Sequence, residues 1–257
     1  MLSIENLSKS FGGVTAIRDL TLRVEQNTIF GLIGPNGAGK TTLFNVITGL
    51  MPPSSGSVRF LGVDISGFKP HEISRLGIAR TFQNVRLFGS MTVLEQVLVG
   101  QSRHAESGAK SLVPLWGLRR ERKLAEEADD LLRLFGLYEK RNRLARELPY
   151  ADQRRVEIAR AMAARPKLIL MDEPAAGMNE AESSDLAEEI VKLRDSGLTV
   201  ILIEHDMSVL MRVSDKVAVL NFGEKLAEGS PKEVQNDPLV IEAYLGKENQ
   251  NERTAAN

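Results

Sequence analysis

The sequence predicts an α/β protein with a mostly parallel sheet, an antiparallel β subdomain and an inserted α-helical subdomain. Three patterns lead to this prediction. Short apolar runs alternate through residues 1–30, a helix-rich stretch covers about 84–160, and strands alternate with helices after it. A regular alternation of strands and helices is typical of a parallel sheet whose crossovers are helical.

The first part of the core is expected to begin with antiparallel strands in residues 1–30. IFGLIG (29–34) is short and fully apolar, as strands buried on both faces are. Apolar residues then recur at helical spacing within NGAGKTTLFNVITGL (36–50). A loop, MPPSSG (51–56), and another short strand, SVRFLG (57–62), follow.

The middle of the chain carries helices, and the last part returns to alternation. KLAEEADDLLRLFGL (123–137) keeps its apolar residues at helical spacing, and HAESGAKSLVPLWG (104–117) is predicted to be a loop. We expect one domain over 1–246, with the helical subdomain at about 84–160, and a polar, disordered tail at 247–257. The later strands are expected at 167–171, 198–203 and 216–221, with helices at 180–196 and 206–213.

Composition excludes several classes of function. The net charge of −1 gives no general basic surface for nucleic acid, and the absence of cysteine excludes disulfides, thiolate metal sites and cysteine catalysis. The apolar runs are far shorter than the roughly 18 residues that indicate a membrane span, and the first residues lack a signal-peptide core. We therefore expect a cytosolic protein that meets a membrane only through a partner.

A phosphate-binding motif follows the strand at 29–34. Gly34 to Thr41 match G-x-x-x-x-G-K-[ST], between a buried strand and a helix, which predicts a P-loop NTPase core. Backbone N–H groups and the positive end of the helix suit phosphate oxygens, Lys40 suits the β- and γ-phosphates, and the Thr41 hydroxyl suits Mg²⁺. The candidate nucleotide-binding residues here are Gly34, Pro35, Asn36, Gly37, Ala38, Gly39, Lys40, Thr41 and Thr42.

Two acids and a histidine end later strands. In LILMDEP (168–174), Asp172 is expected to lie beside Thr41 and hold Mg²⁺, and Glu173 to polarise an attacking water. Taken alone, two acids after a strand would also fit a capped turn. His205 ends the next strand, TVILIEHD (199–206), from which it would reach the γ-phosphate and the water.

The order of the motifs resembles the nucleotide-binding subunits of ABC transporters. The P-loop, TFQN (81–84), LPYADQRR (148–155), LMDEP (170–174), AAGMN (175–179) and IEHD (203–206) occur in the order found there, and the resemblance covers about 1–245. It implies a two-lobed ATPase that binds ATP and Mg²⁺ and dimerises head to tail. The helix from about 150 would then direct its N-terminus at the γ-phosphate held by a partner subunit.

The resemblance also assigns roles to single residues. It implies that Phe11 stacks on adenine, that Gln83 touches metal and water and senses the membrane subunit, and that Gly177 and Asn179 lie on a loop crossing to the partner subunit. It makes His205 the switch histidine. The candidate catalytic residues are thus Lys40, Gln83, Glu173 and His205, and the candidate metal ligands are Thr41, Gln83 and Asp172.

The signature segment departs from the pattern of that family. The common forms are Leu-Ser-Gly-Gly-Gln and Leu-Ser-Tyr-Gly-Gln, whereas here Pro149 replaces the serine and Ala151 the second glycine. Proline has no hydroxyl for the γ-phosphate, a bond worth roughly 1.5–3 kcal/mol. It does suit the first turn of a helix. Pro149, Tyr150, Ala151 and Asp152 are therefore expected to form a weakened but working nucleotide contact.

Within that family, residues 77–100 and 229–246 resemble the branched-chain amino acid importer subunits. The resemblance implies integral-membrane permeases, a second ATPase subunit, either a homologous chain or a second copy, and indirectly an extracytoplasmic solute-binding protein. It implies a peripheral location on the cytoplasmic face of the membrane. The side chains expected to line a groove for a permease helix are Phe82, Leu87, Phe88 and Met91, although ordinary packing in the subdomain would also account for them.

Other readings remain open from sequence. Related cassettes serve urea or amide uptake or lipopolysaccharide export, and Pro149 would also fit a non-catalytic nucleotide switch. A phosphotransferase shares the P-loop but leaves LPYADQRR and His205 without a role. Non-transport ATPases of the same family usually fuse two such domains in one chain, and here there is one.

Overall fold

The computed structural model describes residues 1–101, 114–204 and 207–243, and side chains of the first turns of α4 are not described. Two sheets form the frame, with strand orders β2-β1-β4-β5 and β10-β9-β3-β8-β7-β6. The strands of the first sheet are β1 Leu2–Phe11, β2 Val14–Val24, β4 Ser55–Phe60 and β5 Val63–Asp64. Those of the second are β3 Ile29–Ile33, β6 Ile78–Arg80, β7 Leu168–Asp172, β8 Thr199–Ile203, β9 Lys216–Asn221 and β10 Glu224–Gly229.

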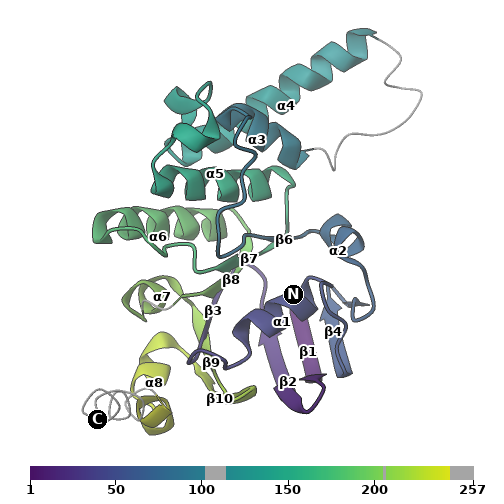
Figure 1. Cartoon of the computed structure of the whole chain (residues 1–257), viewed down its shortest axis with the longest axis vertical. Coiled ribbons are helices and arrows are strands. Elements are labelled where there is room, and N and C mark those ends of the chain that lie inside the picture. The colour runs from purple at the N-terminus through teal and green to yellow at the C-terminus, as the bar shows by residue number, and fades with distance from the viewer. Residues whose placement is uncertain (102–113, 205–206, 244–257) are drawn as a thin grey trace.

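The helices surround the second sheet. They are α1 Lys40–Ile47, α2 Pro70–Leu76, α3 Val93–Gly100, α4 Pro114–Leu134, α5 Tyr150–Ala163, α6 Glu180–Asp195, α7 Met207–Val213 and α8 Pro231–Gln235. Two short 3₁₀ turns, Tyr138–Lys140 and Ala145–Glu147, lead into α5. Figure 1 shows α3, α4 and α5 together in the upper part of the molecule, with the antiparallel sheet at the opposite end.

The second sheet is parallel except for its last hairpin, which confirms the predicted fold class. β3 pairs in parallel with β8 and β9, β7 pairs in parallel with β6 and β8, and β9 and β10 are antiparallel. Every residue of β3, β7 and β8 is buried, because helices or the first sheet cover both faces. The carboxyl ends of these three strands therefore meet at one edge, where open α/β sheets bind ligands.

Two hydrophobic clusters cover the two faces of this sheet. Alternate residues of β7 belong to different clusters. Leu168 and Leu170 pack with α1 and the antiparallel sheet, whereas Ile169 and Met171 pack with α5 and α6. The antiparallel sheet therefore packs on one face and the helical region on the other. A third, smaller cluster joins β9 to α7 and α8.

The helical region enters between β6 and β7, which are adjacent and paired. The predicted loop at 104–117 is too long, because α4 already begins at Pro114; its residues 104–113 lie outside the described part of the chain. The tail at 247–257 also lies outside it. In the described ranges, no helix combines the length and apolar character that a membrane crossing requires.

Candidate active site

The loop between β3 and α1 passes very close to two other strands at its glycines. A Cβ at Gly34 would lie 2.2 Å from the carbonyl oxygen of Leu220, and one at Gly39 2.5 Å from that of Ala16. Gly37 and Gly39 have φ of 82° and 102°, which side chains with a Cβ rarely adopt. These glycines let the loop turn tightly against β9 and β2 and bring its backbone to the surface.

Lys40 begins α1 and is 7% exposed. Its ammonium donates to the carbonyl oxygens of Gly34 and Pro35, at 2.5 and 3.1 Å. A positive charge therefore lies within the loop, next to the first N–H groups of α1 and the positive end of its dipole. Thr41 is exposed and Thr42 half-buried in the same first turn. Ammonium, amides and hydroxyls together suit a polyphosphate.

The remaining loop residues divide into an exposed tip and a buried support. Asn36 is exposed, whereas Ala38 is buried. The Ala38 N–H donates to the Pro35 carbonyl oxygen at 3.1 Å, and the Ala38 carbonyl accepts from Gly223 at 3.1 Å. The turn between β9 and β10 thus supports the loop from below.

Asp172 ends β7 and is 4% exposed. Arg80, at the end of β6, donates to Asp172 Oδ2 at 3.2 Å and to Asn45 Oδ1 of α1 at 2.6 Å. Burial raises the pKa of Asp172, against the opposing effect of the Arg80 guanidinium. Oxygen atoms from Asp172, Thr41 and Gln83 are the hard ligands that Mg²⁺ prefers, so the residues present fit this ion.

Glu173 follows Asp172 in a left-handed conformation, with φ 50°. Its N–H donates to the carbonyl oxygen of Ile203, at 2.9 Å, which fixes the turn to β8. Gln83 Nε2 donates to Glu173 Oε2 at 2.9 Å. The structure therefore brings together two candidate catalytic residues that are 90 positions apart in sequence.

His205 lies outside the described residues. The residue before it, Glu204, directly follows β8 and is 5% exposed, and its Oε1 accepts the N–H of Ala175 at 2.8 Å. Glu204 thus ties the end of β8 to the turn that follows Glu173. No motif role was predicted for Glu204, although an acid directly after four apolar residues was a signal of burial.

The signature segment forms the N-terminus of α5. Pro149 is the N-cap, and its carbonyl accepts from the N–H of Gln153 at 3.0 Å. The expectation that it lies in the first turn was wrong by one position, because the helix begins at Tyr150. Ala151 is buried, and the Asp152 carboxylate pairs with Lys140 at 2.5 Å. Asp152 therefore anchors the helix start within its own chain.

The segment after Glu173 lies against this helix start. A Cβ at Gly177, where φ is 79°, would be 3.3 Å from the Tyr150 ring, and Tyr150 itself is 43% exposed. Asn179 caps α6: its side-chain oxygen accepts from the N–H of Glu182 at 2.9 Å. The Glu182 carboxylate in turn accepts from the N–H of Asn179. The two segments expected to meet a partner are thus neighbours on one surface.

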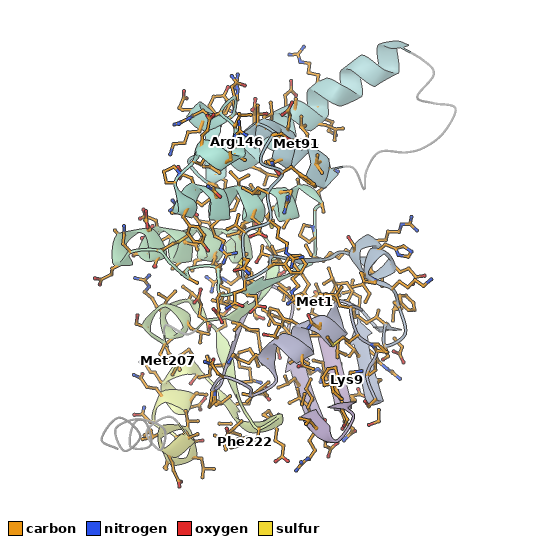
Figure 2. All side chains as sticks on the ribbon, viewed as in Figure 1. Met1, Lys9, Met91, Arg146, Met207 and Phe222 are labelled. Carbon is orange, nitrogen blue, oxygen red and sulfur yellow. The ribbon has the colours of Figure 1, made fainter. Side chains whose placement is uncertain are left out.

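Phe11 ends β1 with 45% of its surface exposed. The Lys9 ammonium lies 5.1 Å from the centre of its ring, a cation–π distance. Figure 2 places Lys9 on the antiparallel sheet, in the lower part of the molecule. One face of an aromatic ring at the surface suits stacking on a base.

Comparison with known families agrees with this arrangement. The sequence profile of the family described as "ABC transporter" matches residues 17–176, more than half of the chain. The chain belongs to the ABC transporter family of ATP-binding cassettes. It is therefore an ATP hydrolase. A second profile, "Branched-chain amino acid ATP-binding cassette transporter", matches residues 224–249.

Named relatives match the cassette over nearly its full length. The high-affinity branched-chain amino acid transport ATP-binding protein BraF of Pseudomonas aeruginosa is 46% identical, over 96% of this chain and 98% of its own. LivG of Escherichia coli, described in the same words, is 44% identical over the same shares. A probable LivG of Methanocaldococcus jannaschii is 36% identical, over 96% and 98%.

Solved structures match the cassette in fold. A nucleotide-free ATP-binding cassette from an ABC transporter gives a TM-score of 0.83 at 35% identity, covering 95% of this chain and 98% of that one. A bacterial ABC transporter cassette solved as a dimer gives 0.77 at 25% identity, covering 90% and 99%. Dimers of cassettes therefore occur in this family.

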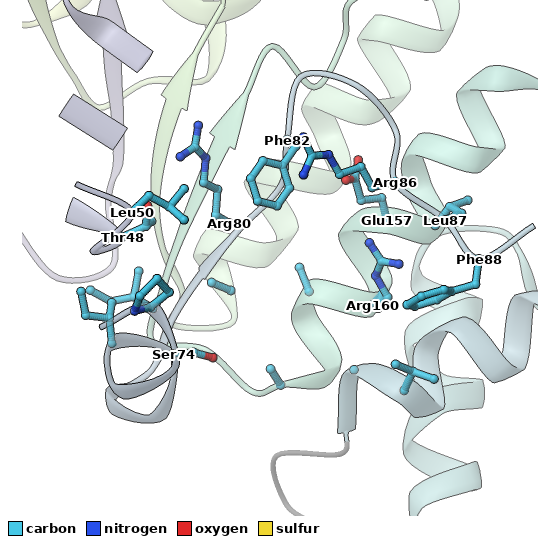
Figure 3. A pocket seen from close by; sticks show the side chains of 18 residues that line it. Thr48, Leu50, Ser74, Arg80, Phe82, Arg86, Leu87, Phe88, Glu157 and Arg160 are labelled. Atoms are coloured by element: carbon cyan, nitrogen blue, oxygen red, sulfur yellow. The ribbon is translucent and has the colours of Figure 1, made fainter. Parts of the chain in front are cut away.

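A groove of about 780 Å³ opens in the cassette between α2, α3 and α5. Phe82, Leu87 and Phe88 line it, as expected, and Figure 3 shows their side chains together with those of Arg86 and Arg160. Met91 was also expected there, but it does not line the groove. Apolar walls with a few guanidinium groups suit an amphipathic helix.

Sequence reasoning missed three charged residues of this site that are buried or nearly so. Arg80 supports Asp172, Glu204 supports the turn after Glu173, and Arg154 of α5 donates to the carbonyl oxygen of Glu173 at 3.1 Å. Arg154 is 0% exposed. Arg80 lies outside the quoted motifs, and the motifs that contain Arg154 and Glu204 gave these two residues no role, because each acts on a segment distant in sequence.

Proposed function

We propose that this cassette energises an importer of branched-chain or related amino acids. The observation that carries the proposal is the match of residues 224–249 to the profile of branched-chain amino acid cassettes. The names of relatives at 46% and 44% identity over 96% of the chain support it. The ATP-hydrolysing core is common to the whole family, so the cargo rests on this C-terminal segment and on these relatives.

Nucleotide binding is assigned to the loop at 34–39 and the first turn of α1. Its amides and the Lys40 ammonium bind the β- and γ-phosphates, and Phe11 stacks on adenine. Thr41, Asp172 and Gln83 hold Mg²⁺, and Arg80 keeps the Asp172 carboxylate in place. When bound, Mg²⁺ supplies positive charge that stabilises the phosphates in the transition state.

Hydrolysis is assigned to Glu173 acting on a water molecule. Its carboxylate accepts a proton from the water as the water's oxygen attacks the γ-phosphorus and the bond to ADP breaks. The 2.9 Å bond from Gln83 holds that carboxylate at the carboxyl end of β7. His205 is assigned to contact the γ-phosphate.

Two cassettes complete each site in this proposal. The N-terminus of α5 in one cassette, at 149–152, meets the γ-phosphate bound by its partner, which is a second copy or a homologous chain. The exposed Tyr150 and its neighbour Gly177 support this assignment, because both expected contact segments share one surface. ATP binding brings the two cassettes together, and ATP hydrolysis lets them separate.

The groove is assigned to a cytoplasmic helix of an integral-membrane permease. The cassette would thereby lie at the cytoplasmic face of the membrane, and an extracytoplasmic solute-binding protein would act on it only through the permease. Gln83 follows Phe82, which lines the groove, so a permease helix seated there adjoins the Gln83–Glu173 contact. This proximity supports coupling between transport and hydrolysis.

Affinity purification of the cassette from its native membrane tests the function. We expect permease subunits to co-purify, and vesicles containing the purified complex to take up labelled leucine when ATP is supplied on the cassette's side. Uptake of urea in place of leucine would overturn the proposal that the cargo is an amino acid. Recovery of the cassette without any membrane subunit would overturn the transport role.

A matched pair of variants tests the groove. Phe88 and Leu239 are exposed to similar extents, 51% and 55%, but only Phe88 lines the groove. We expect Phe88→Asp to prevent co-purification of the permease and Leu239→Asp to leave it intact. Loss of the permease in both variants, or in neither, would argue against this surface.

A further inference from the structure

Arg154 is the most completely buried arginine among the described residues, with 0% exposure. It lies on α5, two residues after the Pro149–Asp152 segment. A buried guanidinium normally needs a charged partner, and Glu157, 2% exposed, provides one at 3.0 Å. This ion pair alone would account for the charge, but Arg154 makes further bonds that it does not need for neutrality.

Those further bonds go to three backbone carbonyl oxygens. Nη1 donates to Phe82, and Nη2 donates to Gln83 and, at 3.1 Å, to Glu173. Phe82 and Gln83 lead into the groove, and Glu173 is the assigned base. One rigid, planar group therefore holds the backbone of both residues whose side chains meet at 2.9 Å.

The same helix presents the segment assigned to the partner's nucleotide. Arg154 lies 6.0 Å from the centre of the Tyr150 ring, which packs against Gly177. Because the guanidinium donates to the loops from two nitrogens at once, the loop at 82–83 and the Glu173 turn cannot shift without straining its bonds to α5.

We propose that Arg154 is a positioning residue that couples the Gln83–Glu173 contact of each cassette to the N-terminus of α5. The inference rests on the proposed composite site of two cassettes. A shift of the loop at Gln83, caused by nucleotide binding or by a permease helix in the groove, is then transmitted to the partner's site through the Arg154 guanidinium. The bonds of Arg154 go to Glu157 and to the carbonyl oxygens of Phe82, Gln83 and Glu173, so it acts through the segments that it holds.

The test compares three variants in full-length cassettes that also carry Glu173→Gln, which preserves the Glu173 carbonyl. Arg154→Lys keeps the charge beside Glu157 but replaces the planar fork by a single ammonium. Arg154→Met with Glu157→Met removes both buried charges, so no unpaired charge is left if the lysine variant fails to fold. Arg155→Lys is the control: Arg155 binds Glu189 of α6 at 3.0 Å and lies 3.8 Å from Asp152, a charge that lysine keeps, and it has no bond to the carbonyl oxygens that Arg154 holds.

Three measurements separate positioning from a general structural role. ATP-dependent dimerisation, followed by analytical ultracentrifugation, should weaken at least about tenfold in both Arg154 variants and stay unchanged in Arg155→Lys. Affinity for a fluorescent ATP analogue in the isolated cassette should stay within about twofold, because Arg154 does not touch the loop at 34–39. Amide hydrogen exchange of residues 81–88 should accelerate in the Arg154 variants alone.

Unchanged dimerisation in Arg154→Lys, or an equal loss in Arg155→Lys, would overturn the proposal. A parallel loss of ATP affinity would also overturn it, since Arg154 would then act on its own nucleotide pocket. If the parent itself fails to dimerise with ATP, the composite site is wrong instead. Hydrogen exchange at 81–88 would still decide whether Arg154 holds this loop.

Discussion

At the scale of single residues, Gly34 and Gly37 of the phosphate loop must be glycine for different physical reasons. A Cβ at Gly34 would lie 2.2 Å from a backbone oxygen of Leu220, whereas one at Gly37 would meet no described atom within 4 Å. Gly37 needs its identity only for a φ of 82°.

We therefore predict that Gly34→Ala destabilises the cassette more than Gly37→Ala does. The clash at Gly34 requires the backbone to shift, whereas the strain at Gly37 costs about 1–2 kcal/mol. Urea unfolding of both variants, with wild type alongside, measures the difference. Equal losses would mean that the close approach to Leu220 is relieved at no cost.

Pro149 gives a second prediction at this scale. A serine there would add a hydroxyl able to bind the partner's γ-phosphate, worth about 1.5–3 kcal/mol, or roughly ten- to hundredfold in ATP-dependent dimer affinity. Serine would also cap α5, because Pro149 occupies the N-cap position. Pro149→Ala is the control, since it removes the ring without adding a hydroxyl.

Measuring dimer affinity and unfolding free energy in both variants separates the two effects. A gain in unfolding free energy alone would assign the hydroxyl to capping. No gain in dimer affinity or turnover in Pro149→Ser would show that this hydroxyl is dispensable here.

Residues in continuous motifs could be predicted, and residues whose partners are distant could not. Lys40 and Asp172 lie in short patterns whose chemistry is local, and the structure gives both the buried positions that the motifs require. Arg80, Arg154 and Glu204 depend on contacts between β6, α5 and β8, which no local pattern encodes. The contact of Gln83 with Glu173 likewise required the sheet order.

At the scale of elements, the segments with a clear apolar pattern were predicted, and two short polar ones were missed. The expected strands at 167–171, 198–203 and 216–221 are confirmed as β7, β8 and β9, with shifts of a residue or less. The helix α2 and the strand β10 were missed. Both are short and polar at their surfaces, so they are fixed by packing and not by periodicity.

The cap of α6 gives a prediction at this scale. Asn179 and Glu182 form a reciprocal capping box, as Thr92 and Glu95 do at α3. Asn179→Ala and Thr92→Ala should each lower the unfolding free energy by about 1 kcal/mol. Only Asn179 lies on the segment assigned to the partner, so only its variant should also weaken ATP-dependent dimerisation. If both variants affected dimerisation equally, Asn179 would act only as the cap of α6.

At the scale of the whole molecule, the parallel strands end at one edge, which carries the groups that the proposal assigns to the phosphates and Mg²⁺ of the chain's own ATP. The loop after β3, Asp172 at the end of β7 and Glu204 after β8 all lie there. The exposed start of α5 belongs to the helical region on the other face of the sheet. In the proposal, one chain thus contributes two separate surfaces to nucleotide binding, which a head-to-tail pair of cassettes would bring together.

We predict that Glu173→Gln stops hydrolysis and accumulates an ATP-bound dimer, because the water loses its base while the nucleotide contacts remain. The chain has no cysteine, so introduced cysteines give unambiguous crosslinks. With Asn36→Cys and Tyr150→Cys, both at exposed positions, a short bifunctional thiol reagent should link two cassettes only when ATP is present. Glu25→Cys paired with Tyr150→Cys is the control, because Glu25 precedes β3 and lies at the opposite edge of the sheet. Crosslinking of the control pair, or none between positions 36 and 150 under ATP, would mean that α5 does not complete a neighbour's site.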